Sequence, residues 1–493
     1  MNKEKFRCHP SIIIENLGAI FIVLGLILIN NIDDLGNILV GIRTAPSIGV
    51  LVGLIALIFG MALYVFIQYR IWYKTWISID NNAIEIERNT INRKHKTYGI
   101  KNISNVNLEQ NIFEQIIGTY KVKIDTDSLS TSNETDIKIV LKKEKAYTFK
   151  SEVMQLASKA KNNKEENANL SQALKREDYD IAYSVKDIFM HSFYALPISS
   201  IISFILLLVL AFVFLGAIDI SENIIEIIVK SLGGLIAILI GIGTSATQGI
   251  VSFLKFFNFR AKRLDTKIIV SQGLLKKRTY EIPINRINAI KIVEPTISRF
   301  FNKQSIELVN VGAGDEKNEG AFLLLSKSKE DIDLLMKKLL PEFVTNTDEN
   351  VKKQPKKALP IIVFHIMLFI VPLIIGYVIF MTLTNLGETV YLLSRLGVIL
   401  IIAFLILTEI MNYLTVGLNV GDDYIAVASG SYKKITKLIK YDKIQYLRSK
   451  ESPLSRLKKL QTYQLYILAN SQNNINTTGL YERDLFDKIY ERM

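Results

Sequence analysis

The chain has 493 residues, 49% of them hydrophobic, and its 60 Lys and Arg residues contribute to a formal net charge of +13. That length has room for about three domains. The single cysteine, Cys8, excludes an intramolecular disulfide and any metal site built from several cysteines. The positive charge indicates either Lys and Arg gathered on the cytoplasmic side of a membrane or a basic surface with an anionic ligand of its own.

Apolar residues gather in six segments that are long enough to cross a membrane, which takes about 20 of them. The segments run over 12–32, 45–69, 188–218, 231–254, 358–386 and 391–411. We therefore predict six transmembrane helices, arranged as three hairpins at 12–70, 188–255 and 359–412.

Charged residues beside these segments predict the orientation of the chain. Lys3, Lys5 and Arg7 precede the first span, and further basic residues follow the second and fourth spans and precede the fifth. The short hairpin loops instead hold mainly acidic residues, such as Asp33 and Glu388. Because Lys and Arg accumulate on the cytoplasmic side, we predict a multi-pass membrane protein with both termini and all three soluble segments in the cytoplasm.

Polar and small residues within the spans have two interpretations each. Arg395 and Glu409 lie near the two ends of the last span, so we expect them to anchor it at the interface; a buried functional charge is the alternative. Gly241, Gly243 and Gly249 in the fourth span predict close helix packing, and a conduction path lined by backbone is the alternative.

The three soluble segments are copies of one domain. They align without a gap at offsets of 184 and 157 residues, so that Ile103, Ile287 and Ile444 coincide. Short β-branched runs that end in turn residues predict strands and hairpins, and apolar residues at helical spacing close each copy. The predicted fold is membrane α-helical plus β-rich: three repeats of a transmembrane hairpin followed by a small β-sheet or barrel capped by a C-terminal helix. The predicted domains span 74–161, 260–343 and 413–493, with a charged linker at 162–187 and a basic linker at 344–358.

A short motif makes these copies resemble a known family. The third copy carries Ser452-Pro453-Leu454-Ser455-Arg456-Leu457, and the second copy keeps most of it and adds an "I-P-x-x-R-I" run. This pattern resembles the bacterial pleckstrin-homology-like (PH-like) membrane proteins, and the three-unit arrangement is similar to their YdbT type. The candidate motif residues are Pro283, Arg286, Ser298, Arg299, Pro453, Ser455 and Arg456. In the first copy, Asn111, Ile112, Glu114 and Gln115 replace the Ser-Pro and the Ser-Arg of the motif, so we expect this copy to perform the motif's role poorly or not at all.

Basic residues after the first strand of each copy are the candidate anion or lipid contacts. They are Arg93, Lys94, Lys96, Lys276, Lys277, Arg278, Lys433, Lys434 and Lys437. The resemblance implies an anionic ligand near this hairpin, and each Lys or Arg close to an anionic leaflet contributes about 1 kcal/mol. An ordinary solvated loop and a protein or cell-wall-precursor ligand are the alternatives.

Catalytic chemistry has no candidate in the sequence. The four histidines lie in separate contexts, and no metalloprotease, phosphate-loop or nucleophile-elbow motif is present. We therefore predict no enzyme activity, no cofactor and no metal site. Nucleic-acid binding is disfavoured because the positive charge is spread over three domains and no recognition motif accompanies it.

Three functions were compared. The first is a scaffold of a bacterial cell membrane, in envelope or stress-resistance physiology, whose cytoplasmic PH-like domains bind proteins or lipid headgroups. The resemblance implies a smaller companion membrane protein with one PH-like domain as its partner. The alternative is a six-helix transporter or export component, although the spans hold no central cluster of ionisable residues. A stress sensor is weakened by extracytoplasmic loops too short for a receptor domain.

Overall fold

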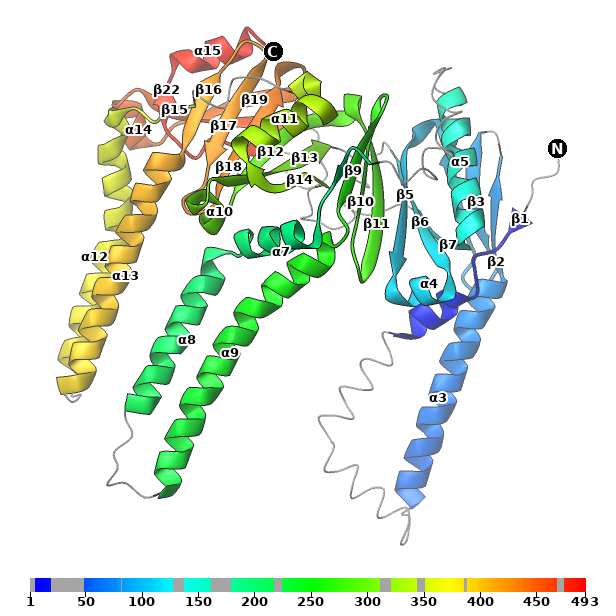
Figure 1. Ribbon diagram of the computed structural model, residues 1–493, viewed down its shortest axis with the longest axis horizontal. Helices are drawn as coiled ribbons and strands as arrows, with labels where there is room; N and C mark the ends of the chain where they lie inside the picture. The colour runs from blue at the N-terminus through cyan, green and yellow to red at the C-terminus, as the bar shows by residue number, and fades with distance from the viewer. Residues whose placement is uncertain are drawn as a thin grey trace. The chain divides into compact units, whose positions relative to one another are not determined.

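The computed structural model describes residues 5–18, 48–80, 82–126, 137–160, 179–216, 224–310, 321–343, 351–384, 388–467 and 474–493 (Figure 1). The chain divides into two compact units. Unit 1 comprises Met1–Asp178 and Lys276–Thr279, and unit 2 comprises Tyr179–Leu275 and Tyr280–Met493. Most of the predicted first span and much of both predicted linkers lie outside the described residues.

Each copy opens with strands that form its first sheet. A two-residue strand precedes each predicted hairpin and pairs with the first strand that follows it. These short strands are β1 (Lys5–Phe6), β8 (Ile181–Ala182) and β15 (Lys352–Lys353). The other first-sheet strands are β2 (Thr75–Ile79), β3 (Ala83–Arg88) and β4 (Lys94–Gly99) in copy 1, β9 (Arg260–Leu264), β10 (Lys267–Gln272) and β11 (Lys276–Pro283) in copy 2, and β16 (Gly417–Val420), β17 (Tyr424–Ser429) and β18 (Lys434–Lys440) in copy 3.

A second set of strands and a helix complete each copy. The strands are β5 (Ile103–Asn111), β6 (Thr119–Thr126) and β7 (Ile137–Lys142) in copy 1, β12 (Ile287–Glu294), β13 (Lys303–Asn310) and β14 (Ala321–Ser328) in copy 2, and β19 (Ile444–Lys450), β20 (Leu460–Ile467), β21 (Asn474–Asn476) and β22 (Tyr481–Glu482) in copy 3. The closing helices are α5 (Lys143–Ala160), α11 (Lys329–Leu339) and α15 (Asp484–Tyr490). In copy 1, Phe149 and Val153 of α5 are buried in the same apolar cluster as Ile77, Ile84 and Ile124 of the strands.

Small structural details recur at the offsets found in the sequence. One-turn 3-10 helices begin at Ile100, Ile284 and Tyr441, and the short helices α4 (Ile112–Ile117), α10 (Thr296–Phe300) and α14 (Pro453–Leu457) follow each at the same distance. The residues after those short helices are left-handed in all three copies: Gly118 with φ 76°, Asn302 with φ 52° and Lys459 with φ 56°. The alignment of the three copies therefore holds to the single residue.

The motif in copy 3 forms a helix cap. Ser452 and Ser455 make a capping box at the start of α14, and Pro453 occupies its first turn, where a missing N–H costs nothing. Copy 1 forms the same box with Asn111 and Glu114, whose backbone N–H groups donate to the other's side chain at 2.8 and 2.7 Å. The expectation that copy 1 performs the motif's role poorly or not at all is therefore wrong for the cap, because different side chains supply the same hydrogen bonds.

Helices precede β2, β9 and β16 along the sequence, and most of them are long and apolar. They are α3 (Ile48–Tyr73), α7 (Val185–Tyr194), α8 (Ile198–Gly216), α9 (Ile224–Phe256), α12 (Leu359–Leu383) and α13 (Glu388–Thr415). Among the described residues, Ser231–Phe256, Lys356–Leu383 and Ser394–Thr415 are long and apolar enough to cross a membrane. The combination of such helices with β-sheets confirms the predicted membrane and β-rich mixture. The full set of three hairpins stays a prediction.

The predicted span at 188–218 is interrupted. Val185–Tyr194 and Ile198–Leu208 are inclined by 73° to one another. The break precedes α8 at Pro197, which has no N–H for a preceding carbonyl. In the next helix, a Cβ added to Gly241 would lie 3.2 Å from Leu207 of α8. Close helix packing is thus confirmed at Gly241, whereas Gly243 has open space around it.

Strand pairing also links successive copies. In unit 2, β12 pairs with β18, which gives one seven-stranded sheet in the order β14-β13-β12-β18-β17-β16-β15. In unit 1, β5 pairs with Lys276–Thr279. Strands β5 and β12 begin the second set of strands in copies 1 and 2. Each pairs with the last first-sheet strand of the following copy, which is β11 or β18.

Candidate functional site

A basic pocket lies in unit 1 beside the end of α3. Its volume is about 340 Å³. The basic residues of its wall are Arg88, Lys94, Lys96 and Lys138, and none of the described residues that line it is Asp or Glu. The other side is formed by residues of α3 and of the helical segment 11–18, among them Ile12, Ile71 and Trp72.

Strand geometry brings these cations together. Lys94 lies opposite Arg88 and Lys96 lies opposite Ile86 in the β3–β4 pairing, and alternate residues of a strand share one face. Lys138 comes from β7. Among the described residues, Nε of Arg88 is buried without a hydrogen-bond partner. The pocket therefore concentrates positive charge and leaves a guanidinium donor unsatisfied.

The helical wall of the pocket is held in place by two hydrogen bonds. The indole Nε1 of Trp72 donates to the carbonyl of Cys8 at 2.8 Å. The amide of Asn16 donates to the side chain of Gln68 at 3.2 Å. Since α3 ends at Tyr73 and exposes apolar side chains such as Phe59, the pocket opens beside a helix end that carries an apolar surface.

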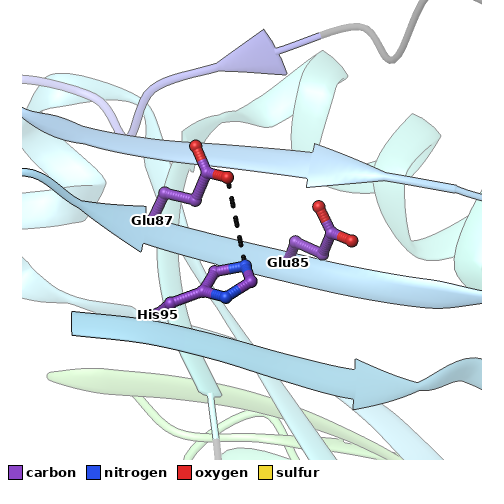
Figure 2. Close-up of side chains that lie close together, drawn as sticks. All are labelled: Glu85, Glu87 and His95. Carbon is purple, nitrogen blue, oxygen red and sulfur yellow. Dashed lines mark ion pairs between the residues drawn. The ribbon is translucent and has the colours of Figure 1, made fainter.

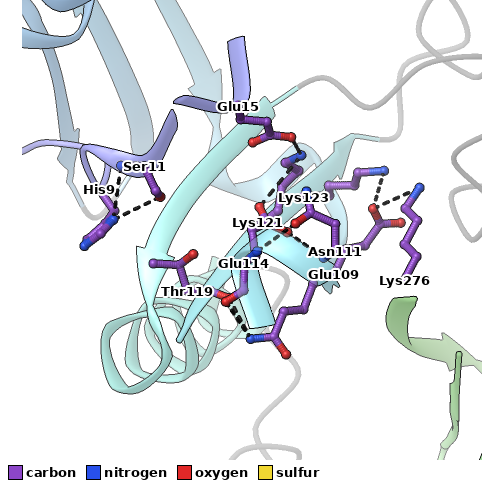
Figure 3. A network of polar contacts seen from close by, with 11 residues as sticks. His9, Ser11, Glu15, Glu109, Asn111, Glu114, Thr119, Lys121, Lys123 and Lys276 are labelled. Atoms are coloured by element: carbon purple, nitrogen blue, oxygen red, sulfur yellow. Dashed lines mark hydrogen bonds and ion pairs between the residues drawn. The ribbon is translucent and has the colours of Figure 1, made fainter. Parts of the chain in front are cut away.

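The corresponding basic residues of copy 2 contact a carboxylate. Lys276 Nζ is 3.5 Å from the carboxylate of Glu109, which is also 3.0 Å from Nζ of Lys123 (Figure 3). Arg278 Nε lies 3.4 Å from the same carboxylate. Burial raises the pKa of Glu109, but these cations hold it below its ordinary value. Burial lowers the pKa of Lys123 to about 8, although Glu109 opposes the shift. Lys277 is exposed.

In copy 3 the same strand position is again covered. Lys434 Nζ lies 2.8 Å from the carboxylate of Glu294. Lys437 lies opposite Lys291 in the β12–β18 pairing, and burial together with that neighbouring ammonium lowers its pKa to about 8. Lys433 is exposed, as are Arg93, Lys94 and Lys96 of copy 1. Of the candidate basic residues, Lys94 and Lys96 of copy 1 line the pocket of unit 1.

The motif residues occupy the loops around the second sheet. Arg299 donates to the carbonyl oxygens of Ser431 and Tyr432 at 2.9 and 3.4 Å, so the arginine of copy 2 holds the hairpin turn of copy 3. Its counterpart Arg456 is 73% exposed, 3.6 Å from Glu451. The remaining members have local roles. Pro283 precedes a 3-10 turn that ends at Arg286, the hydroxyl of Ser298 donates to the Lys303 carbonyl, and Pro453 and Ser455 lie in α14.

A second cluster of polar side chains lies on the opposite face of β3 and β4. Glu85, Glu87 and His95 have ligand atoms within 4.8 Å of one another (Figure 2). Glu87 already has a cation, because Nζ of Lys5 lies 2.9 Å from its carboxylate. We interpret the cluster as a set of surface ion pairs. The sequence analysis missed it, although the alternating pattern of β3 placed both glutamates on one face.

Comparison with known proteins identifies three related segments. A family model described as Bacterial PH domain matches residues 19–157, 201–337 and 366–480. The UPF0699 transmembrane protein YdbT of Bacillus subtilis (strain 168) is 24% identical over 323 residues, which is 63% of this chain and 64% of that protein. The aligned part thus covers less than two thirds of that relative's length. No solved structure matches the chain. The predicted repeats and the predicted family are confirmed.

Proposed function

This chain belongs to the bacterial PH domain family, and from that premise we propose that it is a non-enzymatic membrane protein whose first PH domain binds the anionic headgroup of a phospholipid. The observation that carries this proposal is the pocket of unit 1, whose described lining includes Arg88, Lys94, Lys96 and Lys138 and no acidic residue. A phosphate would give the buried Nε of Arg88 an acceptor, and guanidinium groups bind phosphate oxygens in pairs of hydrogen bonds.

The position of the pocket suits a lipid. Part of its wall belongs to α3, which contains the predicted second span and ends just before β2. A headgroup at the membrane surface would therefore reach the cations of the pocket. We propose that this surface is the cytoplasmic leaflet, because Lys and Arg flank the predicted spans on that side. Anionic lipids give that leaflet its negative potential, and each nearby Lys or Arg contributes about 1 kcal/mol.

Exposed apolar residues at the short helices support contact with a membrane. Ile116, Phe300 and Leu457 occupy equivalent positions in the three copies and are 80%, 83% and 79% exposed. In unit 2, α14 packs through Leu454 against Ile361 at the start of α12, which is a candidate membrane span. An apolar side chain beside a span end can enter the headgroup region together with neighbouring cations.

Lipid titration of the full-length protein in neutral detergent tests this proposal. Trp72 lines the pocket, so its fluorescence reports binding directly. We expect short-chain phosphatidylglycerol to bind and phosphatidylcholine not to bind; inorganic phosphate, as a third arm, shows whether the phosphate alone suffices. Arg88→Gln, Lys94→Gln and Lys96→Gln together remove about 3 kcal/mol, on the order of a 100-fold loss of affinity.

The matched control is Lys433→Gln, which neutralises an exposed cation of copy 3 outside the pocket. It should leave the affinity unchanged. Equal binding of both lipids, or a triple variant that binds phosphatidylglycerol like the wild type, contradicts the headgroup proposal.

Protein interaction is a second candidate function, favoured by the strand pairing between copies 2 and 3. A domain that pairs through its sheet edge inside the chain can pair the same way with a domain outside it. We propose a companion membrane protein with one PH domain as that partner, in envelope or stress-resistance physiology. Crosslinking in the native membrane, followed by mass spectrometry of the purified complex, tests this. Recovery of the chain without any protein partner contradicts it.

A further inference from the structure

Two strand pairings in this chain follow one rule of register. In unit 2, Glu294 of β12 lies opposite Lys434 of β18. In unit 1, Gln110 of β5 lies opposite Lys277. Gln110 and Glu294 are equivalent positions of the repeat, and so are Lys277 and Lys434. The same strand of the domain therefore pairs with the same strand of the next copy, in the same register, twice.

At one position of the repeat, the side chains that face each other across these pairings are matched in chemistry. In copy 1 this position is Glu109, opposite Arg278, and in copy 2 it is Val293, opposite Ile435. Directly opposed residues of a sheet contribute up to about 1 kcal/mol when they match and oppose pairing when they carry like charges. In copy 3 this position is Lys450.

Strand β19 is the copy 3 counterpart of β5 and β12, and its outer edge is open. Among the residues that the structure describes, β19 pairs only with β20. Its side chains Arg448, Ser449 and Lys450 are exposed. Arg456 is exposed as well, whereas its counterpart Arg299 holds the hairpin turn of the next copy. Copy 3 therefore leaves exposed the two features with which copy 2 contacts the next copy, namely the edge of the strand and the arginine.

We infer that the open edge of β19 docks a PH domain of a separate polypeptide, through the last strand of that domain's first sheet, and that this strand carries acidic side chains opposite Arg448 and Lys450. The inference rests on the protein-interaction function proposed above and adds to it the surface, the register and the charge of the partner. An exposed sheet edge accepts an added strand by backbone hydrogen bonds, and the facing side chains decide which strand fits.

A second copy of this chain does not fit the edge. In the shared register, its β4 would place Lys94 opposite Lys450 and Lys96 opposite Arg448. One like-charge pair is tolerated inside the chain, between Lys291 and Lys437, but there Glu307 lies 3.8 Å from Lys291.

In copy 3 the position equivalent to Glu307 carries no acid. It is Gln464, which lies opposite Arg448 in β20. The favourable pair of the register would be Glu451 with Arg93, but Glu451 is already 2.6 Å from Arg483. Charge therefore excludes self-pairing and selects an acidic strand.

An engineered acidic edge of the full-length chain is the probe for this docking. One chain carries His95→Cys with Lys94→Glu and Lys96→Glu, and a second chain carries Ser449→Cys. The register places positions 95 and 449 opposite each other, within the Cα separation that a disulfide spans. The control chain carries Lys450→Cys in place of Ser449→Cys. A shift of one residue puts the two cysteines on opposite faces of the sheet. In membranes that hold both chains, we therefore expect about tenfold or more disulfide with Ser449→Cys than with the control.

The reverse charge change gives an independent second test. Ser449→Cys with Arg448→Glu and Lys450→Glu should crosslink to a chain that carries only His95→Cys, and this pair keeps the lipid pocket intact. Crosslinking no greater than that of the slipped control in both pairs overturns the inference. Equal crosslinking with unaltered Lys94, Lys96, Arg448 and Lys450 also overturns it, because the occupant is then a second copy.

These outcomes are separate from those of the native-membrane experiment. If β19 crosslinks to the engineered acidic strand but no partner protein is recovered, the proposal of a companion protein is contradicted and the docking rule stands. A recovered partner that crosslinks away from β19 contradicts the docking rule and leaves the scaffold function intact.

Discussion

Strands β4 and β18 are the same strand of the repeat in different surroundings. In unit 2, β18 is covered by β12, its Lys434 contacts Glu294, and its Lys437 is half-buried with a lowered pKa. In unit 1, β4 pairs only with β3 among the described residues, and Lys94 and Lys96 line a pocket without carboxylates. Nearly the same basic pattern therefore takes part in strand pairing in one copy and lines a basic pocket in another. The neighbouring strand, and not the motif, decides between these two surroundings.

The largest loss of stability is expected at Glu109 in unit 1, where β5 pairs with Lys276–Thr279. Glu109→Gln leaves Lys123 buried without a counter-charge, and removing one partner of a buried ion pair costs about 3–5 kcal/mol. We expect a large fall in the melting temperature of unit 1. Both tryptophans of the chain, Trp72 and Trp76, lie in this unit, so their fluorescence follows its unfolding.

The control for this variant is Glu87→Gln on the exposed face of the same domain. Its ion pair with Lys5 is largely solvated, and such pairs contribute about 0–1 kcal/mol. If Glu109→Gln destabilised unit 1 no more than Glu87→Gln, the buried cluster would not hold the covered edge together.

A medium loss of stability is expected at Arg299 of copy 2, and a much smaller one at the equivalent Arg456 of copy 3. Arg299→Ala removes hydrogen bonds from a charged donor to two carbonyl oxygens, which are worth about 1.5–3 kcal/mol. Arg456→Ala removes only an exposed side chain, with an expected change within about 0.5 kcal/mol. Hydrogen exchange of β18 in the two variants measures the difference. Equal effects would mean that Arg299 does not hold the junction.

The smallest change in stability is expected at Lys437. Its pKa is lowered to about 8 in the folded protein, so the unfolded chain binds more protons between pH 8 and its ordinary value of 10.5, and stability rises with pH across that window. Lys437→Met removes the buried ammonium, which should stabilise unit 2 by roughly 1 kcal/mol at pH 7 and flatten the pH dependence. Thermal unfolding followed by circular dichroism from pH 7 to 10.5 checks both. An unchanged slope would show that Lys437 does not titrate in this window.

Much of each copy could be predicted from the sequence because local patterns determine it. Strand alternation, turn residues and helical spacing place the elements, and the ungapped offsets align Gly118 with Asn302 and Lys459, which share a left-handed backbone conformation. The break before α8 was missed, although Pro197 was a visible signal for it. The cap in copy 1 was also missed, although Asn111 followed three residues later by Glu114 was a visible signal for a capping box.

Contacts between distant segments could not be predicted in the same way. The pocket joins Cys8, Arg88 and Lys138, and no periodicity relates these positions. The pairing of β12 with β18 depends on the register between two domains, which local patterns do not specify. An acidic residue at Glu294 and a basic one at Lys434 were the available signal, and they become meaningful only once the strands are known to face each other.

Hydrogen exchange of the purified full-length protein, with peptides from β12 and β19 compared directly, tests the central claim that equivalent edges are covered in one copy and open in another. Amides of β12 pair with strands on both sides, so we expect them to be protected throughout. In β19 we expect alternate amides to exchange rapidly, because one side of the strand faces solvent. Uniform protection of β19 to the level of β12 would contradict the account.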